Sequence, residues 1–274
     1  MRNKLNALIE NAVLNILDFD IHTYPPRVVM NIVNRVVPYY IMSYIKQGLA
    51  QVRFRNRMYA TEPGTVVILP PGEPHDHVRI SHEPAVFLWW NFTFKIAGAL
   101  DVLRIMRLPL IFKLADTSSF EELFCSYMEL TKQGLSIPNL IRQKAKSLEV
   151  MAHLLESAVA DNPVLFDESI PDGFIHILLD ILEKPCADFH LAFLAAKYHM
   201  HPTYISNRFK SYFGVAPMQL SREILLEKAK ALLKSGDMTV GQVATTLGYK
   251  DLSAFSRFFA SHTGVSPLRF KNVN

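Results

Sequence analysis

Asn207 and Arg257 occupy matching positions in two segments, 205–217 and 255–267, that nearly repeat each other at an offset of fifty residues. An asparagine amide can bond adenine and an arginine guanidinium can bond guanine, each bidentately, and such a pair contributes about 1 to 3 kcal/mol of base discrimination. Both segments end in Gly-Val-x-Pro, which closes a helical pattern. Two polar-faced helices at a fixed distance are what reading two turns of a DNA major groove would require.

The polar face of each helix follows from its apolar residues. In each segment two large apolar residues stand four apart, so they face inward and leave a polar face on the opposite side. The predicted DNA-contacting residues are Thr203, Ser206, Asn207 and Lys210 in the first helix, and Ser253, Ser256 and Arg257 in the second. Lys210 lies one helical turn after Ser206 and Asn207, where its ammonium group is expected to contact a DNA phosphate.

A shorter amphipathic helix and a tight turn precede each polar-faced helix. The helical spacing is carried by Leu191, Leu194, Ala195 and Tyr198, and again by Val240, Val243, Ala244 and Leu247. His199 stands in the first turn, where a positive φ is favoured and histidine is tolerated better than most residues. Thr239 and Gln242 predict a capping box. Residues 219–234 predict one long helix that would hold the two reading helices about 34 Å apart, one turn of the duplex.

The excess positive charge lies in this C-terminal part. The 274-residue chain has a formal net charge of +4; residues 172–274 contain 12 Lys+Arg and 8 Asp+Glu, whereas residues 1–171 contain 17 of each. This asymmetry favours an anionic partner for the C-terminal part. The alternative is a plain helical domain whose repeat reflects packing, but two units are too few for a solenoid.

Short β-prone runs separated by turn residues occupy the N-terminal part. Strands are expected at 28–33, 39–45, 51–57, 65–69, 77–80 and 86–94. This spacing predicts a small antiparallel barrel or sandwich. Trp89 and Trp90 are adjacent, so they must face opposite sides of their strand. The spacing of apolar residues from Leu5 to Ile16 predicts an amphipathic helix before the strands.

The period becomes helical after residue 97. Apolar spacing predicts one helix around 120–128 and another around 141–155. These helices could cover the barrel, or their exposed side could pair two chains, and the spacing is compatible with both. The loss of periodicity at 161–171 predicts a linker.

His75 and His77 alternate onto one side of a strand, which is the beginning of a metal site. Further ligands would be needed, but Glu83 lies too far along the chain and His82 falls in the wrong register. We therefore predict no metal and no other cofactor, and expect His75, His77 and Trp89 to line a pocket for a small polar effector. A purely structural role at the mouth of the barrel is the alternative.

The segment 171–274 resembles the double helix-turn-helix domain of the AraC/XylS family of bacterial transcription regulators. The closest match is carried by Gln242-Val243-Ala244, Leu247-Gly248-Tyr249, Asp251, Ser253, Phe255-Ser256-Arg257, Phe259 and Gly264-Val265-Ser266-Pro267. Upstream, Pro63-Gly64 and Pro70-Pro71-Gly72-Glu73-Pro74-His75 resemble the cupin-like sensor barrel often joined to that domain. Asn207 replaces a frequent arginine, and Ala260 and Ser261 stand where basic residues are usual.

The resemblance implies an α+β two-domain protein, with an N-terminal cupin-like antiparallel β-barrel with flanking helices and a C-terminal all-α tandem helix-turn-helix domain. The predicted boundaries are an effector-binding and dimerisation domain at 1–160 (barrel about 27–94, helices about 117–160), a linker at 161–171, and a DNA-binding domain at 172–274 with units at about 190–213 and 239–263. The implied function is transcription activation by a homodimer that binds double-stranded DNA, a small-molecule effector such as a carbohydrate, and RNA polymerase.

Other classes of protein fit the sequence less well. Cys125 and Cys186 form no CxxC pair, no apolar run approaches the roughly 18 residues of a membrane span, and Glu10, Asn11 and Asn15 interrupt any signal-peptide core. We therefore expect a cytoplasmic protein without a membrane partner that is not an enzyme. The alternatives are a metal-dependent cupin enzyme with an appended helical module, and a protein-interaction adaptor.

Overall fold

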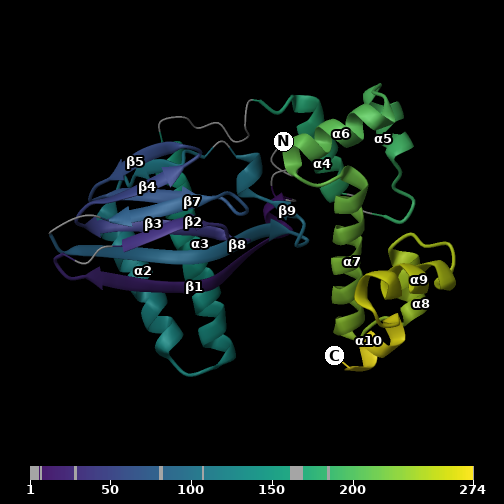
Figure 1. Ribbon diagram of the computed structural model, residues 1–274. Helices are drawn as coiled ribbons and strands as arrows, with labels where there is room; N and C mark the ends of the chain where they lie inside the picture. The colour runs from purple at the N-terminus through teal and green to yellow at the C-terminus, as the bar shows by residue number, and fades with distance from the viewer. Residues whose placement is uncertain are drawn as a thin grey trace. The chain divides into compact units, whose positions relative to one another are not determined.

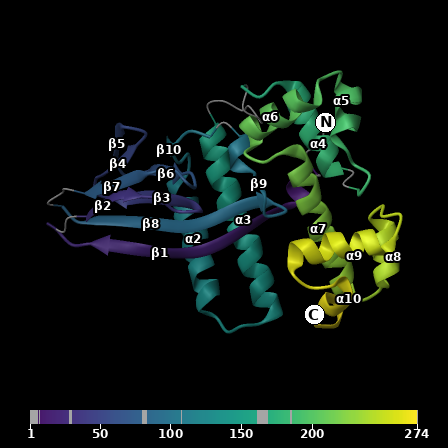
Figure 2. The same ribbon diagram turned by 45° about the vertical axis from the view of Figure 1, so that its right-hand side comes forward.

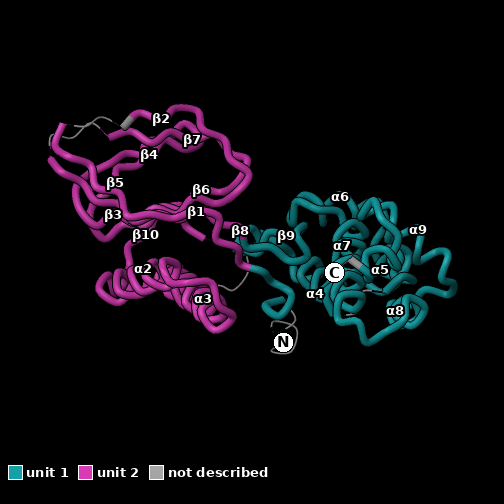
Figure 3. The backbone as a smooth tube through the Cα atoms, turned by 90° about the horizontal axis from the view of Figure 1, so that it is seen from below, with its two compact units in different colours: residues 1–13, 94–106, 166–274 teal, residues 14–93, 107–165 magenta. Residues whose placement is uncertain are grey.

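The computed structural model describes every residue except 1–5, 7, 28–29, 80–82, 107, 161–168, 184–185 and 274. Backbone contacts divide the chain into two compact units: unit 1 contains residues 1–13, 94–106 and 166–274, and unit 2 contains residues 14–93 and 107–165 (Figure 3). Most of the predicted linker, residues 161–168, lies outside the described part of the chain.

Unit 2 contains two antiparallel sheets that face each other across an apolar core (Figure 3). The first has the order β1-β8-β3-β6-β10, from β1 (Ala12–Tyr24), β8 (Ala85–Ile96), β3 (Tyr40–Gln47), β6 (Thr65–Leu69) and β10 (Ile111–Lys113). The second has the order β2-β7-β4-β5, from β2 (Met30–Arg35), β7 (His75–Arg79), β4 (Ala50–Phe54) and β5 (Arg57–Thr61). These sheets form the antiparallel β domain that the sequence predicts.

Two helices cover the outer side of the first sheet. They are α2 (Thr117–Lys132), capped by Asp116, and α3 (Ile137–Val159), capped by Ser136. Trp90 is fully buried beneath them, with its ring 6.4 Å from that of Phe124. Trp89 faces the space between the sheets instead, so the predicted opposite orientation of the two tryptophans is confirmed.

The sequence prediction is wrong at the start of the chain. Ala12 to Ile16 form the first part of β1, and only residues 6 and 8–10 of this region are described as helical. A spacing of four residues fits one face of a helix and also one face of a strand, because four is a multiple of the strand period of two. Pairing with β8, about seventy residues away, decides in favour of the strand.

Unit 1 contains two helix pairs joined by one long helix (Figures 1 and 2). The elements are β9 (Leu100–Asp101), the 3₁₀-helix η1 (Leu103–Ile105), α4 (Asp172–Glu183), α5 (Leu191–Tyr198), α6 (Pro202–Phe213), α7 (Pro217–Ser235), α8 (Val240–Thr246), α9 (Leu252–Thr263) and α10 (Pro267–Val273). With 19 residues, α7 is about 28 Å long. The predicted long helix is therefore confirmed.

Each of the two Gly-Val-x-Pro sequences ends one helix and begins the next. Gly214 ends α6 and Gly264 ends α9, with φ angles of 78° and 76°, values that glycine adopts without strain. Pro217 and Pro267 then begin the next helices, where a missing backbone N–H costs nothing. Among the described residues, no helix combines the length and apolar character needed to cross a bilayer.

Candidate nucleic-acid interface and effector cavity

The polar side of α6 is turned to solvent because its apolar side is fully buried. Ile205 and Phe209 are both 0% exposed. His201 caps the helix, its Nδ1 accepting a hydrogen bond from the backbone N–H of Thr203 at 3.3 Å. On the opposite side, the structure exposes Thr203, Asn207 and Lys210 and leaves Ser206 half-buried.

The same division occurs on α9. Phe255 and Phe259 pack against α7 and α8 in a core that includes Ala229, Leu233 and Val243. The cap is Asp251, whose Oδ1 accepts the backbone N–H of Ala254 at 2.6 Å. Ser253 and Arg257 are exposed and Ser256 is half-buried. The predicted contact residues therefore share one face of each helix, as base reading requires.

The turns within the two helix pairs differ in length. His199 adopts φ 53° after α5, which confirms the expected left-handed turn, and only Met200 separates it from the cap His201. In the second pair Gly248 adopts φ 82°, and two residues separate it from the cap Asp251. The predicted capping box is present, since Thr239 Oγ1 accepts the N–H of Gln242 while Gln242 Oε1 accepts the N–H of Thr239.

A buried carboxylate fixes the first helix pair to α4. Asp180 is 8% exposed, and its Oδ2 accepts hydrogen bonds from Lys197 Nζ at 2.5 Å and from the Tyr198 hydroxyl at 2.6 Å. Burial and the hydrogen bond to Asp180 raise the pKa of the Tyr198 hydroxyl. The role of Asp180 is not predicted from the sequence, where its only signal is an acidic residue inside the apolar run 174–182.

The segment after β8 also packs on the first helix pair within unit 1. The η1 helix contacts α6, and Arg104 Nε donates to the carbonyl oxygen of Tyr212 at 3.4 Å. No sequence pattern indicates this contact, because the residues lie 108 positions apart.

A cavity of about 310 Å³ lies between the two sheets of unit 2. It is lined by Asp18, His22, Tyr24, Ile32, Arg35, Tyr39, Ile41, Ser43, Ile45, Ala50, Val52, Thr61, Val67, His77, Phe87, Trp89 and Asn91. Of the three predicted effector-binding residues, His77 and Trp89 are therefore brought together at the cavity. His75 is not among the lining residues. Arg35 also lines the cavity, and the sequence does not predict this position.

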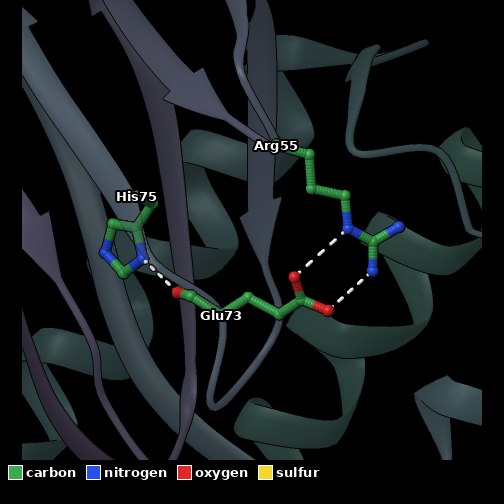
Figure 4. A network of polar contacts seen from close by, with 3 residues as sticks. All are labelled: Arg55, Glu73 and His75. Atoms are coloured by element: carbon green, nitrogen blue, oxygen red, sulfur yellow. Dashed lines mark hydrogen bonds and ion pairs between the residues drawn. The ribbon is translucent and has the colours of Figure 1, made fainter.

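His75 is hydrogen-bonded to the loop that precedes β7 (Figure 4). Its Nδ1 donates to the carbonyl oxygen of Glu73 at 3.1 Å, and the carboxylate of Glu73 pairs with Arg55 at 2.6 Å. Burial lowers the pKa of His75. Burial, followed by the charges of His75 and Arg35, lowers the pKa of His77 to about 4.

The described residues do not complete a metal site around this histidine pair. Within them, no group of three or more His, Cys, Asp or Glu side chains is arranged to hold a metal ion. His82, weighed as a ligand from the sequence, lies outside the described residues.

Comparisons with known proteins identify two matching family models. Residues 31–157 match the model of the AraC-like ligand binding domain, and residues 194–272 match that of a helix-turn-helix domain. The chain is 24% identical to the HTH-type transcriptional regulator YisR of Bacillus subtilis, covering 88% of each protein. It is also 24% identical to the arabinose operon regulatory protein of Escherichia coli, covering 85% of this chain and 80% of that protein.

Among solved structures, one match is wild-type ToxT from Vibrio cholerae, bound to an unsaturated fatty acid. It is 15% identical, with a TM-score of 0.36, and the match covers 95% of this chain and 94% of that one.

Proposed function

Because the chain belongs to the AraC family of transcription regulators, with an AraC-like ligand-binding domain followed by a helix-turn-helix domain, we propose that it reads DNA with α6 and α9 under the control of a small molecule. The observation that carries this proposal is the exposed polar face on both helices, opposite a fully buried apolar face. The bases are read by Thr203, Ser206, Asn207, Ser253, Ser256 and Arg257, while Lys210 binds a phosphate.

The two reading helices divide the work. Lys210 on α6 has its counterpart in Ala260 on α9, so the first helix pair supplies the stronger phosphate contact. Arg257 on α9 has its counterpart in Asn207, and the charged fork of arginine recognises guanine more strongly than an amide recognises adenine. Affinity for any DNA thus comes mainly from α6, and base preference mainly from α9.

The effector binds in the cavity between the two sheets of unit 2. The exposed part of Trp89 offers an aromatic face on which a sugar ring can stack, and the arabinose operon regulatory protein is a relative, so carbohydrates are the first class to test. We place the protein in the bacterial cytoplasm, where the chromosome is. We also propose activation, with a contact to RNA polymerase, and no catalysis, because the two matched domains account for most of the chain.

The helices α2 and α3 provide the surface that pairs two chains. Large apolar side chains are exposed along α3 and in the loop before it: Leu135 (89%), Ile137 (75%), Leu140 (47%), Ile141 (63%) and Leu148 (44%). Isolated exposed apolar residues are common, but a row of them on one helix is typical of an interface. A homodimer would bury this row.

The direct test is DNA binding by the purified full-length protein. Sequencing genomic fragments retained on the protein should recover a common motif, and affinity for it should fall steeply as salt increases. Lys210→Ala should weaken binding to all sequences and lower the salt slope by about one unit, because it removes one phosphate contact. Retention of fragments without any shared motif, with or without candidate effectors, would contradict the proposal.

A further inference from the structure

Arg35 is the one lysine or arginine among the described residues that line the cavity of unit 2. It lies at the end of β2, directly opposite His75 in the pairing with β7, and its side chain is half-buried. A positive charge inside a mostly apolar cavity is costly unless an anion or a hydrogen-bond acceptor accompanies it.

No such partner is present in the described part of the chain. Arg35 makes no ion pair and no side-chain hydrogen bond there, whereas two exposed arginines of the same sheet region are both paired. Arg53 contacts Asp76 at 3.3 Å and Arg55 contacts Glu73 at 2.6 Å. Two outward-facing arginines near the cavity are thus paired with carboxylates, whereas the cavity-lining Arg35 is not paired within the described residues.

A second polar group lacks a partner at the same wall. His77 lines the cavity, is 9% exposed, and its Nε2 has no hydrogen-bond partner. It stands opposite Ile32 on β2, three residues from Arg35. Burial, with smaller contributions from the charges of His75 and Arg35, lowers the pKa of His77 to about 4, so the imidazole is neutral at pH 7 and can hydrogen-bond a ligand without adding charge.

The remaining wall is largely apolar. Ile41, Ile45, Val52, Val67 and Phe87 line it, and Trp89 adds an aromatic face. The cavity also contains one acid, Asp18, but this residue is exposed and its Oδ1 already accepts the N–H of Phe19 at 2.9 Å. Water screens an exposed charge much more than a half-buried one, so Asp18 does not cancel the attraction of Arg35 for an anion.

We propose that the effector is a small carboxylic acid whose carboxylate binds Arg35 and accepts a hydrogen bond from the Nε2–H of His77, while its body packs on the apolar wall. This inference rests on the proposed effector function of the cavity and specifies the ligand class. A volume of about 310 Å³ suits a molecule of monosaccharide or single-ring size. Sugar acids and small aromatic acids share this chemistry.

The test compares acids with neutral counterparts of the same shape on the full-length protein. Glucuronate is paired with glucose, and benzoate with benzamide, each at about 10 mM, enough to occupy a site of millimolar affinity. Sodium chloride equalises the ionic strength, and binding is read as a rise in melting temperature and then by calorimetry. We expect at least one acid to bind and its neutral counterpart to bind at least about 10-fold more weakly.

Two variants assign the effect to Arg35. Arg35→Gln should weaken binding of the acid by about 10- to 100-fold, and Arg35→Lys, which keeps the charge but not the bidentate fork, should weaken it less. Arg57→Gln is the matched control, because Arg57 is exposed on β5 and does not line the cavity. If Arg35→Gln does not fold, the weaker acid binding expected of Arg35→Lys provides the test.

Three results would overturn the inference: equal binding of an acid and its neutral counterpart, unchanged acid binding by both Arg35 variants, or no binding of either acid. Binding of glucose without binding of glucuronate would exclude a carboxylic acid as the effector. It would remain consistent with the proposed function as an effector-controlled regulator. DNA binding is measured separately, without any effector, so a failure of the proposed function itself is distinguishable.

Discussion

His199 and Gly248 share a left-handed backbone conformation at corresponding turns, with φ angles of 53° and 82°. The chain thus adopts the left-handed conformation once with a residue that tolerates it and once with one that adopts it freely. The positive φ therefore belongs to both turns, although the turns differ in length.

Gly248→Ala should lower the free energy of unfolding of the helical domain by about 1 to 2 kcal/mol, the cost of a left-handed non-glycine residue. The added Cβ would also lie 3.4 Å from Cys186 Cβ. Urea denaturation followed by far-ultraviolet circular dichroism measures the change. Gly241→Ala is the control: Gly241 is in the first turn of α8, and the nearest atom to an added Cβ is Thr239 Oγ1 at 4.0 Å, an ordinary contact, so alanine should stabilise by about 0.5 to 1 kcal/mol. Equal effects of both substitutions would contradict this account of the turn.

Arg257→Ala should relax sequence preference at one base pair by about 1 to 3 kcal/mol, because it removes a bidentate contact from the exposed face of α9. Binding competition among DNA sites that differ at single positions measures this. Arg269→Ala on α10 removes the same charge from an exposed position of another helix and should leave the preference intact. If both variants keep the wild-type preference, α9 does not read bases.

The stability of unit 2 should fall as the pH is lowered from 7 to 5. The pKa of His77 is lowered to about 4 in the folded chain, below its unfolded value of about 6.5, so the unfolded state binds more protons in this range. The loss from His77 should be about 2 kcal/mol at pH 5, and below pH 4 its contribution becomes constant. Urea denaturation followed by tryptophan fluorescence measures it, since Trp89 and Trp90 are both in this unit.

His77→Gln should remove most of this pH dependence, whereas His22→Gln should not, because His22 is exposed. The prediction fails if wild-type protein and His77→Gln lose the same stability between pH 7 and pH 5.

Ile141→Glu should convert a homodimer into monomers, because it places a charge in the row of exposed apolar residues on α3. Light scattering coupled to size exclusion measures the mass. Arg142→Glu introduces an acid at the adjacent exposed position, on a neighbouring face of the helix, and should preserve the dimer. A monomeric wild-type chain at micromolar concentration would rule out this interface.

The helices α6 and α9 could be predicted because their signals are local. The four-residue spacing of Phe255 and Phe259, the cap Asp251 and the closing Gly264 all lie within one helix and its ends. Each therefore specifies the same structure without reference to the rest of the chain.

The cavity could be predicted only in part, because it depends on contacts between distant strands. Strand alternation places His75 and His77 on one side, but the bond of His75 to the Glu73 carbonyl and the absence of His75 from the cavity lining are properties of the folded loop. Nothing in the spacing of Arg35 shows that it lines a cavity or lacks an anionic partner. The strand β1 was mistaken for a helix for the same reason, since its partner β8 is far away in sequence.

The continuous helix α7 between the two helix pairs also limits where residues can be inserted into this chain. Each residue inserted into an α-helix turns everything beyond it by about 100° and moves it by about 1.5 Å. One insertion in α7 would therefore rotate α9 relative to α6, although every predicted contact residue would be kept. If both helices read DNA as proposed, insertions would be tolerated only outside α7, and the length of that helix would set the separation of the two half-sites.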